Sequence, residues 1–134
     1  MKLLLDTQVL IWAGWDLLPT ATAARIADPA TTVYFSTASL WEIVIKNGLK
    51  RADFRLNTAD FWHELLANGY RQLDIAAEHI LAVATLPRLH ADPFDRLLIA
   101  QANTEHLTLL TTDARILQYP GEIEKVAKPR PPVF

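Results

Sequence analysis

The stretch MKLLLDTQVL, residues 1–10, begins with an apolar run and passes directly into an aspartate. Apolar and polar residues do not alternate over residues 2–5, which is typical of a strand buried on both faces of a parallel sheet. A second run of this kind covers residues 107–110, near the other end of the chain. The two runs predict the centre of a parallel sheet.

Further strand and helix patterns alternate between these two runs. Residues 32–35 are β-branched and aromatic and predict a third strand, while 70–73 and 125–127 are weaker strand candidates. Helical patterns cover 20–27, 39–47, 58–67, 76–86 and 93–105, and several end at Gly or before Pro. Strands that alternate with helices through short loops predict an α/β fold with a mainly parallel sheet.

The composition favours one soluble domain. A chain of 134 residues that is 51% hydrophobic is long enough for one buried core and short for two, so we expect a single domain over 1–134 with a proline-rich tail at about 129–134. The 13 Lys and Arg nearly balance the 15 Asp and Glu, so the net charge of −2 exerts no general attraction on nucleic acid or membrane. A nucleic-acid partner would therefore need a local basic patch.

Two absences in the sequence narrow the chemistry and the compartment. The chain has no cysteine, which excludes disulfides, thiolate metal sites and cysteine nucleophiles, and fits a reducing cytoplasm. The first residues are too short and too polar for a signal peptide, and no apolar stretch is long enough to span a membrane. We expect a cytoplasmic protein without a membrane partner.

Four acidic residues occupy positions where ligands bind in such folds. Asp6 directly follows the first predicted strand, and Asp113 directly follows LTLLTT. Glu42 lies in the first turns of the helix after TVYFS, and Asp95 lies in the first turn of the helix before LTLLTT. Ligands bind outside the carboxyl ends of parallel strands, at a topological switch point. We therefore expect four carboxylates from four segments to meet in one crevice.

Each of these acids also has a local structural interpretation. Asp6 is suited to cap a short helix at 8–12, and Asp113 to cap the turn ARIL. Glu42 fits the capping-box spacing with Ser39 in SLWE. Local capping explains each residue singly, but it does not explain why all of them converge on one edge.

Asp92 and Asp95 stand three residues apart at the start of an apolar helix. Asp92 is suited to be the N-cap, with Pro93 at the first helical position. Asp95 then lies in the first turn, where the helix dipole favours an anion. We interpret Asp92 as structural and keep Asp95 among the candidate functional acids.

Carboxylates that gather in a partly buried crevice repel each other, so they require a cation. Hard oxygen ligands, without cysteine or a helical histidine pair, indicate Mg²⁺ or Mn²⁺ rather than zinc, with one or two ions. A bound divalent ion polarises a phosphate and lowers the pKa of an attacking water. The acids therefore predict hydrolysis of phosphodiester bonds.

The four segments LLLDTQVL, SLWEIVIK, DPFDRLLIAQA and LLTTDARI, in this order, resemble the four acidic motifs of the PIN domain. The likeness is strongest to VapC-type ribonuclease toxins of prokaryotic toxin–antitoxin pairs and spans residues 6 to about 117. Carried across by position, the four acids of the motifs fall on Asp6, Glu42, Asp95 and Asp113.

The resemblance implies an α/β/α sandwich and a Mg²⁺- or Mn²⁺-dependent endoribonuclease, with the four acids as catalytic metal ligands. It also implies a homodimer that is inhibited by a small antitoxin encoded beside it. Thr7 and Thr111 or Thr112 match hydroxyl positions that orient the acids or a metal-bound water in similar proteins, and Asp92 is a further candidate for this role. Thr112 stands where relatives often have asparagine.

Basic residues near the acids are candidates for contact with RNA phosphates. Lys46, Lys50, Arg51 and Arg55 gather after the helix that carries Glu42, although such a charge run also fits a solvated loop. Arg96 is adjacent to one of the acids and is suited either to approach RNA or, as we favour, to form a salt bridge with a neighbouring acid.

Histidine and tryptophan offer fewer indications of function. The four histidines lack the i, i+4 spacing of a helical metal pair, and only His90 is expected near the rim of the crevice. Trp12 and Trp41 lie within apolar helical stripes, so we expect them to pack in the core or at a subunit interface rather than to stack on bases.

Other interpretations of the acids stay open. Aspartyl-phosphate proteins also place Asp after a first strand, but they require Asp-x-Asp or an acidic pair with a late lysine, which DTQ and TTDAR do not supply. A PIN nuclease in RNA processing or DNA cleavage remains an alternative, as does a nonenzymatic module that holds a structural ion. Since the chain starts at the first motif, we expect a stand-alone toxin.

Overall fold

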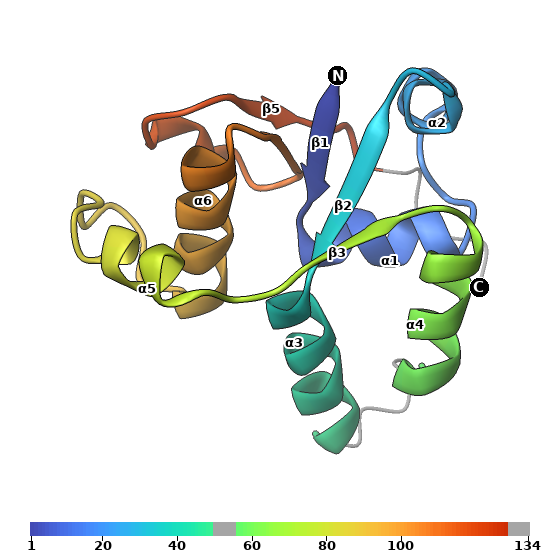
Figure 1. The fold of residues 1–134 in the computed structure, drawn as a ribbon, viewed down its shortest axis with the longest axis horizontal. Coiled ribbons are helices and arrows are strands. Elements are labelled where there is room, and N and C mark those ends of the chain that lie inside the picture. Colours follow the sequence, from blue (N-terminus) through green and yellow to red (C-terminus); the bar gives the residue numbers. More distant parts are fainter. Residues whose placement is uncertain (50–55, 129–134) are drawn as a thin grey trace.

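The computed structural model describes residues 1–49 and 56–128, which form one sheet with helices on both faces (Figure 1). All strands are parallel, in the order β3-β2-β1-β4-β5. This arrangement confirms the predicted three-layer α/β/α sandwich with a parallel sheet. The predicted tail at 129–134 lies outside the described residues.

The predicted strands are present, and most begin or end within one residue of the predicted bounds. The last predicted strand, 125–127, begins two residues earlier in the structure, because Ile123 pairs with Leu109 of the neighbouring strand. The strands are β1 (Lys2–Leu5), β2 (Thr32–Ser36), β3 (Arg71–Leu73), β4 (Thr108–Thr111) and β5 (Ile123–Lys125).

Three of the five predicted helices have the predicted bounds, and the other two differ at both ends. The helix predicted at 39–47 spans Thr37–Gly48, and the helix predicted at 76–86 spans Ala77–Val83. From Ala84 to Leu86 the backbone continues as tighter i to i−3 turns, because Pro87 disfavours a helical conformation of the residue before it. The helices are α1 (Thr7–Gly14), α2 (Thr20–Ala27), α3 (Thr37–Gly48), α4 (Thr58–Ala67), α5 (Ala77–Val83) and α6 (Pro93–Glu105), with a 3₁₀ turn η1 (Ala114–Gln118).

Alternate residues of the central strand pack into two separate cores. Leu3 and Leu5 pack with α1, α4 and part of α3, whereas Leu4 packs with α6 and η1 on the other face. In Figure 1, α5 and α6 lie to the left of the strands, and α1, α2 and α4 lie to the right. Burial on both faces explains why the strand sequence is apolar throughout. No helix of the described residues is long and apolar enough to cross a membrane.

The topology places a switch point between β1 and β4. The chain runs from β1 to β2 and β3 on one side of the sheet, and then crosses through α5 and α6 to β4 on the other side. The backbone N–H of Asp6 donates to the carbonyl of Leu110 at 3.0 Å, which aligns the carboxyl ends of the two strands. Ligand sites are expected at this position of an open α/β sheet.

Candidate functional site

All four predicted acids line one cavity at the carboxyl edge of the sheet, with a volume of about 370 Å³. Asp6 follows β1, Glu42 lies in α3, Asp95 lies in the first turn of α6, and Asp113 follows β4. Asp92, the N-cap of α6, lines the same cavity. The structure thus brings together carboxylates that are separated by up to 107 positions in the sequence.

Asp6 is the most buried of these acids, with 6% of its surface exposed. Its side chain accepts the backbone N–H of Val9 at 2.8 Å, so the predicted capping of α1 is confirmed. Burial raises the pKa of Asp6, and the charge of Glu42 adds to the rise, while hydrogen bonds from the Thr111 hydroxyl and the Thr112 and Val9 backbones oppose it. These three hydrogen bonds favour the charged form of Asp6 against the effect of burial.

Asp95 is positioned by its neighbour at the start of α6. The Asp92 side chain accepts the backbone N–H groups of Phe94 at 2.9 Å and Asp95 at 3.1 Å, which confirms Asp92 as the N-cap. Burial raises the pKa of Asp95 to about 6, and the charges of Asp92 and Asp6 contribute to the rise, against the lowering effect of His90. Asp95 is a carboxylate that a divalent cation would stabilise strongly.

Asp113 lies nearer to solvent and has a cationic partner. Its side chain accepts the backbone N–H of Arg115 at 2.9 Å, which confirms the predicted cap of the ARIL turn, and the Arg115 guanidinium lies 2.8 Å from Oδ2. Arg115 lowers the pKa of Asp113. The Asp113 backbone N–H donates to Thr111 Oγ1 at 3.1 Å, and the same hydroxyl hydrogen-bonds Asp6. Thr111 therefore connects two of the acids.

Glu42 has no capping role, so the capping box with Ser39 was a wrong prediction. Ser36 caps α3 by accepting the backbone N–H of Ala38 at 3.0 Å, and Ser39 lies inside the helix. The buried Ser39 hydroxyl instead accepts the Thr7 hydroxyl at 2.9 Å, which ties α1 to α3. Glu42 therefore extends from the second turn of α3 toward the cavity.

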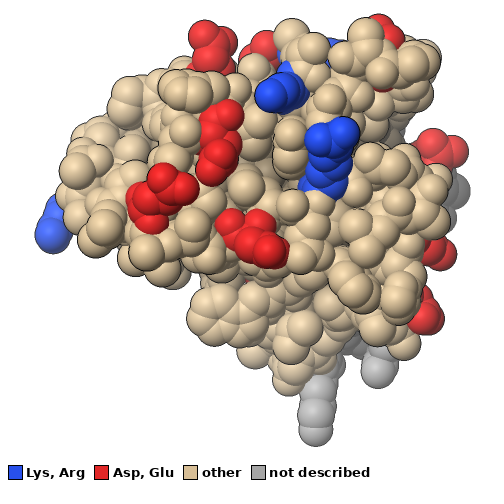
Figure 2. All heavy atoms as spheres, in the orientation of Figure 1, with Lys and Arg blue, Asp and Glu red and all other residues tan. Residues whose placement is uncertain are grey.

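The predicted basic residues differ in their positions. Lys46 lines the cavity and lies 3.9 Å from the carboxylate of Glu42, whereas Lys50, Arg51 and Arg55 lie outside the described residues. Figure 2 shows one face of the molecule, on which acidic and basic side chains both occur among uncharged ones. Contacts with an anionic ligand would therefore depend on cations at the cavity itself.

The salt bridge expected of Arg96 is not the contact that the structure shows. Its guanidinium donates to the carbonyls of Pro87 at 2.8 Å and Val83 at 3.2 Å, and to the Tyr119 hydroxyl at 3.2 Å. The tyrosine hydroxyl in turn donates to the carbonyl of His90 at 3.3 Å. Arg96 thus fixes the loop between α5 and α6 rather than a carboxylate.

Three residues that the sequence analysis did not assign to the site also line the cavity. Gln8 and Trp12 belong to the first two turns of α1, and Lys128 follows β5 at the same edge of the sheet. The weak strand pattern at 125–127 was a signal for Lys128, because it placed this residue directly after a carboxyl end. Trp12 is half-buried and lines the cavity, so it is not part of either core described above.

His90, in the loop before α6, lies beside two of the acids, Asp95 and Asp113. Its Nε2 lies 2.9 Å from Asp95 Oδ2 and 4.0 Å from Asp113 Oδ2, and 11% of its side chain is exposed. One ligand atom from each of these three residues fits within 4.8 Å of the others, as a shared metal ion requires. The expected position of His90 near the crevice is therefore correct.

A second group, Glu78, His79 and Glu105, has comparable spacing but lies apart from this cavity. The Ala76 backbone N–H donates to Nδ1 of the buried His79 at 2.9 Å, so Nε2 carries the proton and donates to Glu105 Oε1 at 3.1 Å. Both ring nitrogens are used, and this histidine joins α5 to α6 instead of binding an ion.

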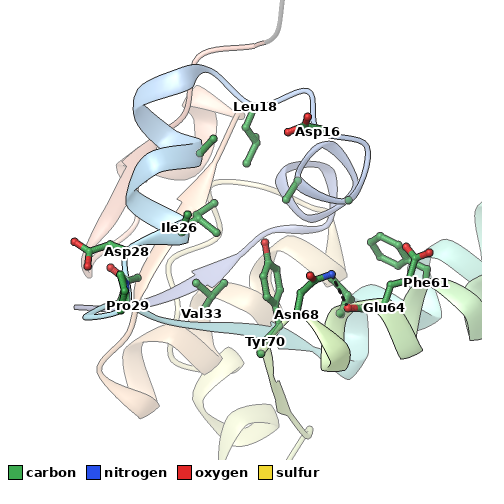
Figure 3. Close-up of a pocket in the computed structure, with 17 residues that line it drawn as sticks. Asp16, Leu18, Ile26, Asp28, Pro29, Val33, Phe61, Glu64, Asn68 and Tyr70 are labelled. Carbon is green, nitrogen blue, oxygen red and sulfur yellow. Dashed lines mark hydrogen bonds between the residues drawn. The ribbon is translucent and has the colours of Figure 1, made fainter.

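A second cavity of the described residues, about 480 Å³, lies between α1, α2 and α4. Figure 3 shows Leu18, Ile26, Val33 and Tyr70 around it, with Asn68 donating to the carbonyl of Glu64 at 2.9 Å. None of the four predicted acids lines this cavity. The four predicted acids therefore share one cavity, at the edge between β1 and β4.

The donor set at that edge fits a hard divalent cation. Burial and neighbouring carboxylates raise the pKa values of the buried Asp6 and the partly buried Asp95, so a cation in the cavity would stabilise their charged forms. Oxygen ligands of this kind suit Mg²⁺ and Mn²⁺.

Comparison with known families identifies the fold and the class. A model of the PIN domain family matches residues 3–122, so the chain belongs to the PIN domain family. PIN domains are nucleases, which supports hydrolase activity for this site in general terms. A comparison with curated proteins finds no significant match.

Solved structures of VapBC toxin–antitoxin complexes share this fold. The chain matches VapBC2 from Rickettsia felis bound to a promoter DNA fragment with a TM-score of 0.72 and 18% identity, over 94% of this chain and 99% of that one. It matches DNA-bound VapBC from Salmonella typhimurium with a TM-score of 0.69 and 16% identity, over 93% and 98%. VapBC-5 from Mycobacterium tuberculosis gives 0.60 and 18%, over 94% and 98%.

Proposed function

We propose that this protein is a metal-dependent endoribonuclease of the VapC type, a cytoplasmic toxin whose activity is inhibited by a cognate antitoxin. The observation that carries the proposal is the convergence of Asp6, Glu42, Asp95 and Asp113 on one cavity at the switch point of a PIN fold. Burial and neighbouring carboxylates raise the pKa values of Asp6 and Asp95, which is the electrostatic condition in which a divalent ion stabilises them.

In this proposal the four acids hold one or two Mg²⁺ or Mn²⁺ ions, and a bound ion would polarise the scissile phosphate and activate water. Asp92 fixes the start of α6 and thereby the direction of Asp95. Thr111 orients Asp6 and Asp113, Thr112 supports Asp6 through its backbone, and Thr7 positions α3 through Ser39.

Binding of the RNA backbone is assigned to cations at the same cavity. Lys46 and Lys128 line it, and each offers an ammonium group for phosphate oxygens. We keep Lys50 and Arg51 as further candidates because they follow α3 in sequence. Arg96 is left to its structural contacts with the loop before α6.

The decisive test is cleavage of a labelled single-stranded or structured RNA with Mg²⁺ or Mn²⁺, with EDTA as the metal-free control. Asp6→Asn and Asp95→Asn should each abolish cleavage while circular dichroism shows a folded protein. Asp16→Asn removes an exposed carboxylate outside the site and should cleave normally. Undiminished cleavage by either site variant would contradict the proposal.

The same assay separates the alternatives. A DNA oligonucleotide of identical sequence tests whether the 2′-hydroxyl is required, and preferential cutting of DNA would favour the DNA nuclease. Metal binding without cleavage of either nucleic acid would favour a nonenzymatic module. Addition of the protein encoded next to the gene tests the toxin role, because a cognate antitoxin should suppress cleavage at a one-to-one ratio.

We also propose that a second copy of the chain covers α3. An exposed apolar stripe on this helix consists of Trp41, Val44 and the C-cap residue Leu49, and 61% of Trp41 is exposed although its ring packs edge-on against Phe94 at 5.4 Å. Trp41 is thus not a core residue, which leaves the predicted subunit interface and the less favoured stacking on bases. Light scattering should give about twice the 15.1 kDa chain mass, and Val44→Glu, but not Leu117→Glu, should reduce it to one chain.

A further inference from the structure

We propose that His90 is a direct ligand of the metal centre, so that the centre contains one imidazole nitrogen besides its carboxylates. This proposal rests on the proposed function, because it requires that the cavity bind a divalent ion. It adds a residue outside the four acidic motifs and changes the expected metal preference from that of an all-oxygen site.

The spacing of the ligand atoms carries the argument. Two atoms that are each bound about 2.1 Å from one ion lie about 3 Å apart at right angles and about 4.2 Å apart when opposite. His90 Nε2 lies 2.9 Å from Asp95 Oδ2 and 4.0 Å from Asp113 Oδ2. These separations suit one adjacent and one nearly opposite ligand of the same ion.

The direction of the imidazole favours a shared ion over a simple hydrogen bond. If His90 served only to neutralise Asp95, it would need to lie close to that one carboxylate. Here Nε2 faces carboxylates from two elements, the first turn of α6 and the end of β4. Asp113 already has the Arg115 guanidinium as its cationic partner. Charge neutralisation of Asp113 therefore does not require His90.

The backbone of His90 is also held in place, through Tyr119 and Arg96. Its carbonyl accepts the Tyr119 hydroxyl, and that hydroxyl accepts a hydrogen bond from Arg96. Arg96 simultaneously binds the carbonyls of Val83 and Pro87, on the preceding part of the loop. These contacts hold the backbone of His90 beside the acids.

An imidazole ligand has a consequence for the choice of metal. Mg²⁺ prefers oxygen ligands, whereas Mn²⁺ and later transition metals accept imidazole and bind mixed sites more tightly. His90→Gln should therefore weaken Mn²⁺ binding by about tenfold or more, a loss typical of disturbed metal sites. Mg²⁺ binding should change by less than about threefold.

The experiment is pulsed electron paramagnetic resonance of the full chain loaded with Mn²⁺ alone, combined with calorimetric titration of Mn²⁺ and Mg²⁺. The expected spectrum contains a ¹⁴N coupling from a directly bound imidazole. His90→Gln should remove this coupling, and His63→Gln, an exposed histidine of α4, should retain it.

The possible outcomes separate this proposal from the proposed function. Loss of the nitrogen signal and of Mn²⁺ affinity in His90→Gln supports the ligand assignment, whether or not RNA is cut. Mn²⁺ binding without a ¹⁴N coupling overturns the assignment and leaves the nuclease proposal standing. A nitrogen signal that persists in His90→Gln also overturns it. Absence of any divalent binding overturns both proposals.

Discussion

Asp92 Oδ1 accepts the backbone N–H of Asp95 at 3.1 Å, so that one carboxylate fixes the first turn of the helix that presents the other. This relationship explains why two acids stand three residues apart at the head of an apolar helix. One contributes helix stability, and its negative charge raises the pKa of its neighbour. It also allows the two contributions to be separated by mutation.

Replacement of Asp92 by Ala should lower the free energy of unfolding by about 1 kcal/mol, because the cap of α6 is lost. Asp92→Asn should retain most of this stability, since its amide oxygen still accepts the two backbone N–H groups. Urea denaturation of both variants in metal-free buffer measures the difference. Equal losses for Ala and Asn would show that the charge, not the cap, is what stabilises the helix.

Asp95 should make the metal-free protein less stable as the pH rises. Its pKa is about 6 in the folded chain against 3.8 ordinarily, so the folded state binds the proton more tightly than the unfolded state does. The stability that this proton contributes is fully present below pH 3.8 and is lost as the pH rises through 6. Between pH 4.5 and 7.5 the loss should be about 1–2 kcal/mol, allowing for partial contact with solvent.

Asp95→Asn should remove this contribution. From pH 4.5 to pH 7.5 the free energy of unfolding of this variant should therefore rise by the same amount relative to that of the parent chain. Urea denaturation with a chelator at pH 4.5 and 7.5 measures it, and Asp16→Asn serves as the control outside the site. A difference between Asp95→Asn and the parent chain that does not change with pH would contradict the expected role of the carboxylate.

The buried pair of Ser36 and Gln101 should couple the end of β2 to α6. The Ser36 hydroxyl donates to Gln101 Oε1 at 2.6 Å and accepts the Ala38 backbone N–H at 3.0 Å, and both side chains are fully buried. Gln101→Leu should destabilise the fold by about 1–3 kcal/mol, because the hydroxyl proton loses its partner in the interior. Urea denaturation measures the loss.

A double-mutant cycle tests this coupling. Adding Ser36→Ala to Gln101→Leu should cost less than the sum of the two single substitutions, because the second change removes the unpaired hydroxyl. Strictly additive losses would mean that water or another group replaces the lost partner.

Gly121 should tolerate no side chain. Its φ is +124°, and a Cβ added there would lie 1.9 Å from Asn103 Oδ1, in a side chain that is itself held by donation to the Pro120 carbonyl at 2.8 Å. Gly121→Ala should destabilise the protein by about 1–3 kcal/mol. Gly48→Ala, at the end of α3 with open space around it, should be neutral or stabilising by up to about 1 kcal/mol. Thermal melts of the two variants give this comparison.

Local signals in the sequence were sufficient for much of the fold. The bounds of α2, α4 and α6 were predicted without error, because residues next to them stop or start a helix by backbone chemistry, as Asp92 and Pro93 do for α6. The apolar runs of β1 and β4 were recognised because central parallel strands are buried on both faces. The positions of the four acids after these elements followed directly.

Features that depend on distant partners were missed or misassigned. The start of α3 was placed at Ser39, but the hydroxyl of Ser39 contacts Thr7, 32 positions away, and Ser36 is the cap. Arg96 was expected to pair with an acid and instead binds carbonyls of a loop. No local pattern distinguishes these alternatives, since each side chain has the same hydrogen-bonding groups in either arrangement.

The sequence by itself determined which segments become strands and helices and which acids follow them, because capping, proline geometry and burial on two faces act over a few residues. Only the tertiary structure decided which side chains share the cavity: it brought Asp95 within electrostatic reach of Asp6 and placed Glu42 and Asp113 around the same space. Burial and charge in this cavity depend on distances between segments, and those distances exist only once the sheet has formed.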